Sequence, residues 1–281
     1  TKKKFCEFKK HNLNIVNYSM PVKKILSKKK LSHYLHSEKN YPDAVPYITS
    51  YYKRRWGFCI SLNQRKKLPK GNYKAFIDSS FKKGTMDMCH AILKGKSKKE
   101  IFFTSYICHP SMVNNELSGP VVLNKLIQYV KKNYPKPKFS YRFVLGPETI
   151  GSIAYISRYK NILKKNMFAG FNLTCVGDNR EYSYLASRNG NTIADYALKS
   201  SIAYKKNSSQ YSYLKRGSDE RQYCAPGVDL PLCTFHRSKS YKEYHTNKDD
   251  FKLVTEKNLQ ESLKVLTDII DAFETCLYPK A

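Results

Sequence analysis

The sequence predicts an α/β protein in which a three-layer α/β/α sandwich follows a small β-rich domain. From about residue 99, apolar strand-like runs alternate with amphipathic helical segments, an order typical of a parallel sheet with helices on both faces. Residues 13–98 instead contain short alternating segments separated by turn signals such as Lys-Gly-Asn at 70–72. We therefore expect a small β-rich inserted domain at 13–98 and an α/β/α domain at 99–281.

In the second of these domains, each strand and helix has its own local signal. A helix is expected to begin at Pro120, because Leu123, Leu126 and Val130 recur with the spacing of one buried helical face. Thr255 is expected to cap a final helix. The other expected strands and helices are strands at 101–107, 141–145, 168–175 and 232–235, and helices at 150–158 and 191–204. In the small domain, strand-like segments are expected at 13–18, 47–52, 58–62, 73–77 and 88–93.

Composition limits the class of protein. With 281 residues and 41% hydrophobic content, the chain is long and apolar enough for one large core and a small second domain. No apolar run reaches the roughly 18 residues of a membrane span, and no signal peptide is recognisable. The eight cysteines form no Cys-x-x-Cys pair, and several, including Cys108 and Cys175, lie in apolar runs. We expect reduced core cysteines in a cytoplasmic protein. The chain begins without Met, so we expect it to be part of a longer protein.

The formal net charge of +29 raises the question of nucleic-acid binding. The lysines, however, are spread over the whole chain rather than gathered in one stripe. Lys, Asn, Ile and Tyr are abundant together, which indicates an AT-rich coding bias. The composition therefore argues against a nucleic-acid partner and leaves only a weak general attraction to acidic partners.

Polar residues follow the expected strands at the points where the strands end. His109 follows the strand at 101–107, Glu148 the strand at 141–145, and Asp178 the strand at 168–175. In open α/β sheets, ligands bind beyond the carboxyl ends of the strands. A hydrolytic zinc site needs imidazole and carboxylate ligands, an open position for water, and a carboxylate that accepts a proton. His245, in a polar loop, completes such a set, and His236 is a reserve candidate. A single loop histidine is more often an ordinary hydrogen-bonding residue, but four polar sites at consecutive strand ends favour the metal site.

Six motifs together resemble a known family. They are Tyr-Ile-Cys-His-Pro-Ser at 106–111, Asn-Asn-Glu-Leu-Ser-Gly at 114–119, Pro-Glu-Thr-Ile-Gly-Ser at 147–152, Thr-Cys-Val-Gly-Asp at 174–178, Arg-Gly-Ser-Asp-Glu-Arg at 216–221 and Tyr-His-Thr at 244–246. The sequence resembles the co-catalytic zinc aminopeptidase and glutamate carboxypeptidase superfamily, and more closely its bacterial aminopeptidase-like branch linked with polysaccharide biosynthesis. That branch carries a small β domain inserted into the zinc-peptidase fold and a winged-helix tail. The resemblance implies that this chain lacks the first part of the fold and the tail.

The resemblance also implies roles for individual residues. His109 matches the family's first metal ligand and His245 its last, while Glu148 matches the general base. Asp178 lies near a strand-end Asp ligand, although the strict register places Thr174 there. The implied cofactor is Zn²⁺, and the implied substrate is a small peptide or another amide-bearing molecule.

Three positions depart from the family pattern. Ser111 stands where an Asp orients the first histidine, Asn115 where an Asp bridges two zinc ions, and Thr149 where a second Glu ligand is expected. Neutral amides and hydroxyls bind zinc less well than carboxylates, and Glu116 is a possible substitute for the bridging Asp. We therefore expect one zinc ion, or a weakened pair, instead of two full sites.

The remaining candidates concern the substrate. Arg216, Ser218, Asp219 and Tyr244 are candidate substrate-binding residues, with a capped helix start and ordinary surface arginines as the alternative interpretation. Three functions are compared: a zinc-dependent amide or peptide hydrolase in surface polysaccharide biosynthesis, a catalytically silent zinc- or substrate-binding scaffold of the same fold, and a nucleic-acid module. The sequence does not define the exact substrate or the oligomeric state.

Overall fold

The computed structural model describes residues 3–276, which form two compact units. The first unit contains the described residues up to 85 together with 110–112 and 240–250. The second contains 86–109, 113–239 and the described residues from 251. Within residues 3–276, each helix is too short or too polar to cross a membrane.

The first unit is built from short elements around a small apolar core. β1 (Val22–Ser27) pairs antiparallel with β4 (Asn72–Ile77), and β2 (Leu35–His36) pairs parallel with β3 (Phe58–Cys59). Its helices are η1 (Asn12–Asn14), α1 (Lys28–Leu31), η2 (Ser32–Tyr34) and α2 (Leu62–Lys66). The expected strand at 73–77 is present as β4. The segments at 13–18 and 47–52 do not form the expected strands. They pair only at single residues, with Ile15 opposite Phe58 and Asn17 opposite Thr49.

The second unit contains a seven-stranded mixed sheet with the order β10-β9-β11-β8-β6-β7-β5. The strands are β5 (Cys89–Leu93), β6 (Glu100–Tyr106), β7 (Ser140–Gly146), β8 (Met167–Leu173), β9 (Tyr182–Leu185), β10 (Ser208–Tyr211) and β11 (Leu232–His236). β7, β6, β8 and β11 run parallel, whereas β9 is antiparallel to β11 and β5 is antiparallel to β7. The segment at 88–93, expected in the small domain, is thus the edge strand of the large sheet.

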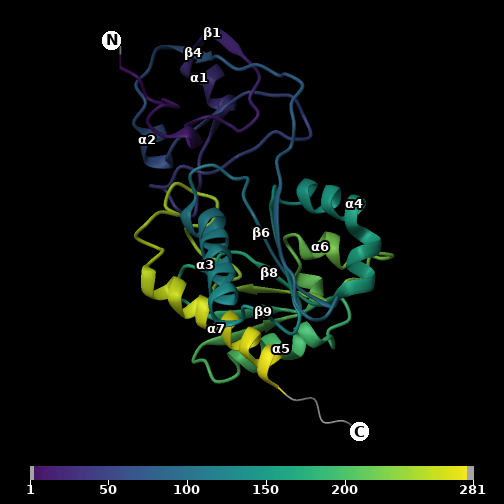
Figure 1. Cartoon of the computed structure of the whole chain (residues 1–281). Helices are drawn as coiled ribbons and strands as arrows, with labels where there is room; N and C mark the ends of the chain where they lie inside the picture. Colours follow the sequence, from purple (N-terminus) through teal and green to yellow (C-terminus); the bar gives the residue numbers. More distant parts are fainter. Residues whose placement is uncertain (1–2, 277–281) are drawn as a thin grey trace. The chain divides into compact units, whose positions relative to one another are not determined.

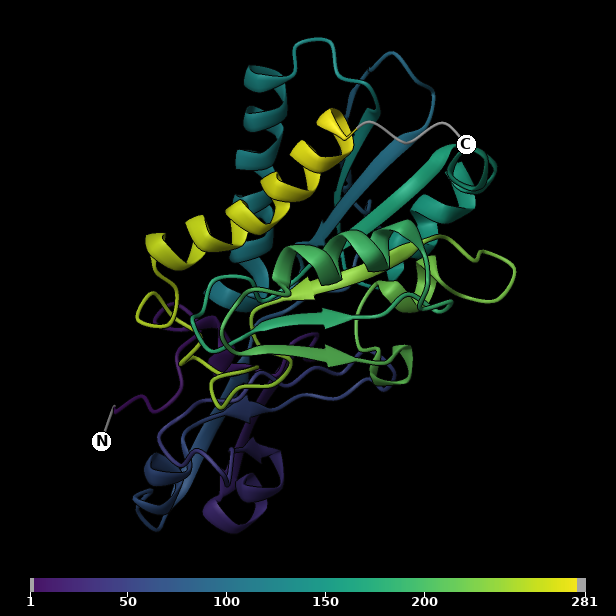
Figure 2. The same ribbon diagram turned by 90° about the horizontal axis from the view of Figure 1, so that it is seen from below.

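Helices cover both faces of this sheet, as Figures 1 and 2 show. Helices α3 (Ser118–Asn133), α5 (Ile193–Ile202) and α7 (Glu256–Thr275) pack together on one face. Helices α4 (Ile150–Asn166) and α6 (Glu220–Tyr223) lie on the other, and η4 (Tyr213–Lys215) precedes α6. The Thr255 hydroxyl accepts a hydrogen bond from the Asn258 N–H and caps α7 as expected. The predicted three-layer α/β/α fold is confirmed.

The two helical layers create two apolar cores, one on each side of the sheet. Successive strand residues point to opposite faces, so Phe103 enters the core beneath α3 and α7 while Phe102 enters the core beneath α4. A buried ion pair lies near the start of the strands: Arg142 donates to both carboxylate oxygens of Glu100, at 2.7 and 2.8 Å. Arg142 also donates to the Tyr155 hydroxyl at 3.0 Å.

The carboxyl ends of β6, β7 and β8 meet at one edge of the sheet, where η3 (Val113–Leu117) leads into α3. This turn is π-helical, a geometry often found at functional sites. Gly119 lets α3 approach the strand ends, since a Cβ there would lie 2.1 Å from the Ser105 hydroxyl oxygen and 2.9 Å from the Leu173 carbonyl oxygen. The extra residue of the π turn and the close helix packing bury Asn114, Asn115 and Glu116 against the strand ends.

Candidate functional site

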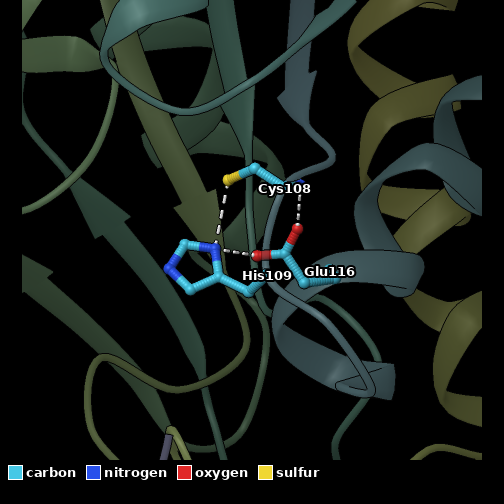
Figure 3. A group of neighbouring side chains, drawn as sticks. All are labelled: Cys108, His109 and Glu116. Atoms are coloured by element: carbon cyan, nitrogen blue, oxygen red, sulfur yellow. Dashed lines mark hydrogen bonds and ion pairs between the residues drawn. The ribbon is translucent and has the colours of Figure 1, made fainter. Parts of the chain in front are cut away.

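Cys108, His109 and Glu116 lie together just beyond the end of β6 (Figure 3). His109 Nδ1 is 2.5 Å from Glu116 Oε1 and 3.1 Å from Cys108 Sγ. The other carboxylate oxygen of Glu116 accepts a hydrogen bond from the Cys108 N–H at 2.6 Å, which fixes the carboxylate beside the loop. Among residues 3–276, this is the one cluster of three His, Cys, Asp or Glu side chains with ligand atoms close enough to share a metal ion.

The charges in this cluster are unusual for a buried histidine. Burial lowers the pKa of His109, but hydrogen bonds and charge from Cys108 and Glu116 outweigh it and raise the pKa to about 11. Cys108 is exposed as a residue, but the groups around its sulfur exclude enough water to raise the pKa of the thiol above its ordinary value, and the hydrogen bond to His109 opposes this shift. Without a metal, an imidazolium therefore sits between a carboxylate and a thiol.

Glu148 faces the other side of the same imidazole. Its carboxylate lies 3.9 Å from His109 Nε2 and is 23% exposed, so it is accessible from solvent while largely enclosed. Burial raises the pKa of Glu148, and the charge of His109 and the Ser218 hydroxyl oppose this shift. The Glu148 N–H donates to Cys108 Sγ at 3.3 Å, which joins the end of β7 to the Cys108 loop.

Glu148 is held at this position by a strained turn. Thr149 has φ 64° and ψ −66°, and the Ile150 N–H donates to the Glu148 carbonyl at 2.7 Å. These values define a γ-turn, which is rare and costs about 1–3 kcal/mol for a β-branched residue. Strain of this kind persists only where the surrounding contacts enforce it.

Asp219 supplies those contacts. Its buried carboxylate accepts the Thr149 N–H at 2.7 Å and the Ser152 hydroxyl at 3.0 Å. Burial raises the pKa of Asp219 to about 7, with a further contribution from the charge of Glu148. The neighbouring Glu220 accepts N–H groups from Gly217 at 2.6 Å and Ser218 at 2.9 Å and so shapes the loop that presents Asp219. In the structure Asp219 anchors the turn that follows Glu148, and its contact with substrate stays a prediction.

Asn115 belongs to a neutral hydrogen-bonded group. Its amide nitrogen donates to the Tyr106 hydroxyl at 2.9 Å, and that hydroxyl is 2.5 Å from the Thr174 hydroxyl. Asn115 also approaches Cys175 Sγ at 3.5 Å. Asn115 and Thr174, where the resemblance implies a bridging Asp and a strand-end Asp, are thus neutral side chains that share Tyr106 as a hydrogen-bond partner.

Asp178 is completely buried and engaged in protein contacts. Its carboxylate accepts Asn114 Nδ2 at 2.9 Å, the Ser238 hydroxyl at 2.8 Å and the Arg180 N–H at 2.9 Å. Asn114 in turn accepts the Gly177 N–H at 2.7 Å. These bonds account for a buried carboxylate without a metal. The role of Asp178 as a ligand stays a prediction.

His245 and Tyr244 lie in the first unit, whereas the other candidates lie in the second. The Tyr244 ring stacks on the His245 ring at 3.9 Å, and the edge of Tyr47 meets His245 at 5.3 Å. The His245 carbonyl accepts the Tyr47 N–H at 2.7 Å. These contacts fix the loop of the first unit that carries the histidine. The contributions of His245 to metal binding and of Tyr244 to substrate binding remain predictions.

Other sequence candidates are placed as follows. Arg216 is exposed and lies over the Tyr213 ring at 4.9 Å, and Ser218 is buried beside Glu148. His236 is buried at the end of β11, and burial lowers its pKa to about 4, so it stays neutral. The expectation that Cys108 is a core residue is wrong. β6 ends at Tyr106, so Cys108 lies past the sheet, is exposed, and points its thiol at His109.

Comparisons with known proteins agree with this architecture. A zinc aminopeptidase from Bacillus subtilis superposes with a TM-score of 0.68 over 92% of this chain and 78% of its own, at 15% identity. A crystal structure from Clostridium acetobutylicum described as a peptidase superposes with a TM-score of 0.92 at 33% identity, covering 99% of this chain and 68% of that one. Fold and strand-end site thus define an aminopeptidase-like α/β protein.

The particular family follows from sequence. The model of the family described as a domain of unknown function, DUF4910, matches residues 11–276, and the chain belongs to this family. A relative from Clostridium acetobutylicum, named as a polysaccharide biosynthesis protein with an aminopeptidase-like domain, is 36% identical over 275 residues. The match covers 96% of this chain and 62% of that relative, so the chain spans less than two thirds of the curated relative's length.

Proposed function

We propose that this chain is the catalytic region of a zinc-dependent hydrolase that cleaves an amide or peptide bond, acting in surface polysaccharide biosynthesis. The family membership and the aminopeptidase-like fold support the reaction class, and the name of the Clostridium relative supports the pathway. The substrate is expected to be a small peptide or an N-acylated molecule.

The observation that carries the proposal is the placement of Glu148. A general base must reach the attacking water yet retain a proton during the reaction. Glu148 lies at a strand end, is 23% exposed, and has a raised pKa because it is largely buried. Its carboxylate takes the proton from water and passes it to the leaving amine. The strained turn at Thr149 and the anchor at Asp219 hold the carboxylate in place for both transfers.

The donor set fits one metal ion better than two. The two-zinc arrangement implied by the family needs carboxylates at positions 115, 149 and 174, and this chain has Asn115, Thr149 and Thr174. His109 and Glu116 remain as charged or imidazole donors near the end of β6. A bound zinc ion supplies Lewis-acid polarisation and lowers the pKa of water. In the proposal, His109 and Glu116 help to hold that ion, with His245 as a further predicted ligand.

A second function is favoured by the neutral group around Asn115. Tyr106, Asn115 and Thr174 satisfy one another by hydrogen bonds, and they need no metal to do so. This arrangement suits a zinc- or substrate-binding scaffold that has lost hydrolysis. The two functions differ in turnover, not in fold.

The test combines metal content with turnover. We would measure zinc per chain in the purified protein by elemental analysis and screen aminoacyl anilides and N-acylated amino sugars for hydrolysis. Glu148→Gln keeps the size of the side chain but removes the proton acceptor, so we expect normal folding, retained zinc and a loss of about 10²–10⁴-fold in kcat. Glu256→Gln, an exposed change in the first turn of α7, is the matched control and should leave the rate unchanged.

Two outcomes would oppose the proposal. If Glu148→Gln matched the parent rate on a cleaved substrate, Glu148 would not be the base. If zinc were bound but no amide in the panel were cleaved, the scaffold function would be the better explanation.

A further inference from the structure

We propose that Cys108, His109 and Glu116 form a mononuclear site for a divalent transition metal, with the Cys108 thiolate as a direct ligand. The inference rests on the proposed function, because it names the donors of the metal on which that function depends. It differs from the carboxylate-rich set implied by the family resemblance. Its starting point is the convergence of three ligand atoms within 4.8 Å of one another at the end of β6 (Figure 3).

The contacts of His109 Nδ1 distinguish a ligand set from a catalytic triad. In a thiol–histidine–acid triad, the acid and the nucleophile contact opposite nitrogens of the imidazole. Here Cys108 Sγ and Glu116 Oε1 approach the same nitrogen, at 3.1 and 2.5 Å. This geometry does not allow the imidazole to pass a proton from the thiol on one nitrogen to the acid on the other. It does place three donor atoms around one position that an ion could occupy.

The distances are compatible with a small ion after a modest adjustment. With Zn–N near 2.0 Å and Zn–S near 2.3 Å, tetrahedral ligand atoms are roughly 3.3–3.6 Å apart. The Sγ–Nδ1 separation of 3.1 Å is already close to that spacing. The Nδ1–Oε1 separation of 2.5 Å would have to open by about 1 Å, as expected when a metal ion replaces the proton shared in this contact.

The surroundings of Cys108 orient its sulfur. The Glu148 N–H donates to the sulfur at 3.3 Å, and hydrogen bonds of this kind fix the orientation of a metal ligand. The Cys108 N–H orients Glu116 from the second carboxylate oxygen, so the first oxygen is available for an ion. Three ligands from the second unit leave the fourth tetrahedral position for water or for a further ligand, as in catalytic zinc sites.

Cobalt substitution tests the thiolate directly. Co²⁺ added to the metal-stripped, purified protein should produce a sulfur-to-metal charge-transfer band in the near ultraviolet, with an endpoint of one ion per chain. Cys108→Ser should abolish that band and weaken Co²⁺ binding by at least roughly tenfold, since even the loss of a group that only orients a metal ligand costs that much. Cys276→Ser, at an exposed cysteine just after α7, is the matched control and should keep the full band.

Glu116→Gln separates ligand loss from misfolding. It keeps an oxygen for the Cys108 N–H but removes the charge, so the band should persist while Co²⁺ binds more weakly. Co²⁺ binding without a charge-transfer band, or a band that survives in Cys108→Ser, would overturn this inference and leave the hydrolase proposal standing. A cysteine-dependent band in a protein that cleaves no amide would support this inference and oppose the hydrolase.

Discussion

The buried carboxylate of Asp219 gives a prediction that separates charge from hydrogen bonding. The pKa of Asp219 is raised to about 7 by burial and by the charges of Glu148 and Glu220, whereas an exposed Asp titrates near 4. The folded protein therefore holds a proton that the unfolded chain has released between these two pH values. The contribution of Asp219 to the free energy of unfolding is fully present at about pH 4 and is lost as the pH rises toward 7.

The size of the effect follows from the shift. One proton changes the free energy of unfolding by about 1.4 kcal/mol per pH unit, so a shift of about three units corresponds to at most roughly 4 kcal/mol. Asp219→Asn keeps an oxygen for the Thr149 N–H and the Ser152 hydroxyl but cannot ionise. Relative to the parent, we expect this variant to gain about 2–4 kcal/mol between pH 4 and pH 8.

Asp219→Ala isolates the hydrogen bonds. It leaves the Thr149 N–H and the Ser152 hydroxyl without their acceptor and releases the strained turn, for an expected loss of roughly 2–4 kcal/mol at pH 4. The assay is urea unfolding across pH 4–8 in the presence of a chelator, with the exposed Asp268→Asn as control. Parallel stability curves for the parent and Asp219→Asn would refute the assignment of the raised pKa to Asp219.

Two further predictions follow from other parts of the second unit. Glu100→Gln should destabilise the protein by about 3–5 kcal/mol in urea unfolding, because it leaves the buried Arg142 guanidinium without its charge partner, and a loss below about 1 kcal/mol would contradict this. The exposed Lys264–Asp268 pair is the contrast, and Asp268→Asn should cost less than about 1 kcal/mol. Restoring acids with Asn115→Asp and Thr149→Glu together should raise the zinc stoichiometry above that of the parent in elemental analysis, and two tightly held zinc ions in the unmodified protein would refute the premise.

The sandwich was predictable because its signals are local. The spacing of Leu123, Leu126 and Val130 defined one face of α3, and the Thr255 cap defined the start of α7. The partners of short edge strands could not be predicted from local sequence signals. The segment around β5 alternates like a strand of the small domain, yet its partner is β7, about fifty residues away, and only tertiary pairing decides that choice.

In the candidate site, too, features set by local sequence could be predicted, whereas features set by tertiary contacts could not. The positions of His109 and Glu148 just past two strands were predictable because each follows an apolar run that ends in a polar turn, and their roles stay predictions. Cys108 was missed, because its apolar neighbours suggested burial, and the end of β6 at Tyr106 is a tertiary feature. The anchoring role of Asp219 was also missed, since its partner Thr149 is distant in sequence.

Asn115 and Thr174 are neutral and share Tyr106 as a hydrogen-bond partner, whereas Cys108 and Glu116 place donor atoms beside His109. Asn115 in η3 and Thr174 after β8 are neutral, so neither side chain supplies the negative charge that a second cation would need. The π turn at the start of α3 buries the side chain next to Asn115, so that Glu116 points to His109. The negative charge at this turn is therefore on Glu116, whose carboxylate contacts the same His109 nitrogen as the Cys108 thiol. The single-metal site proposed at Cys108, His109 and Glu116 therefore needs neither a carboxylate at position 115 nor one at position 174.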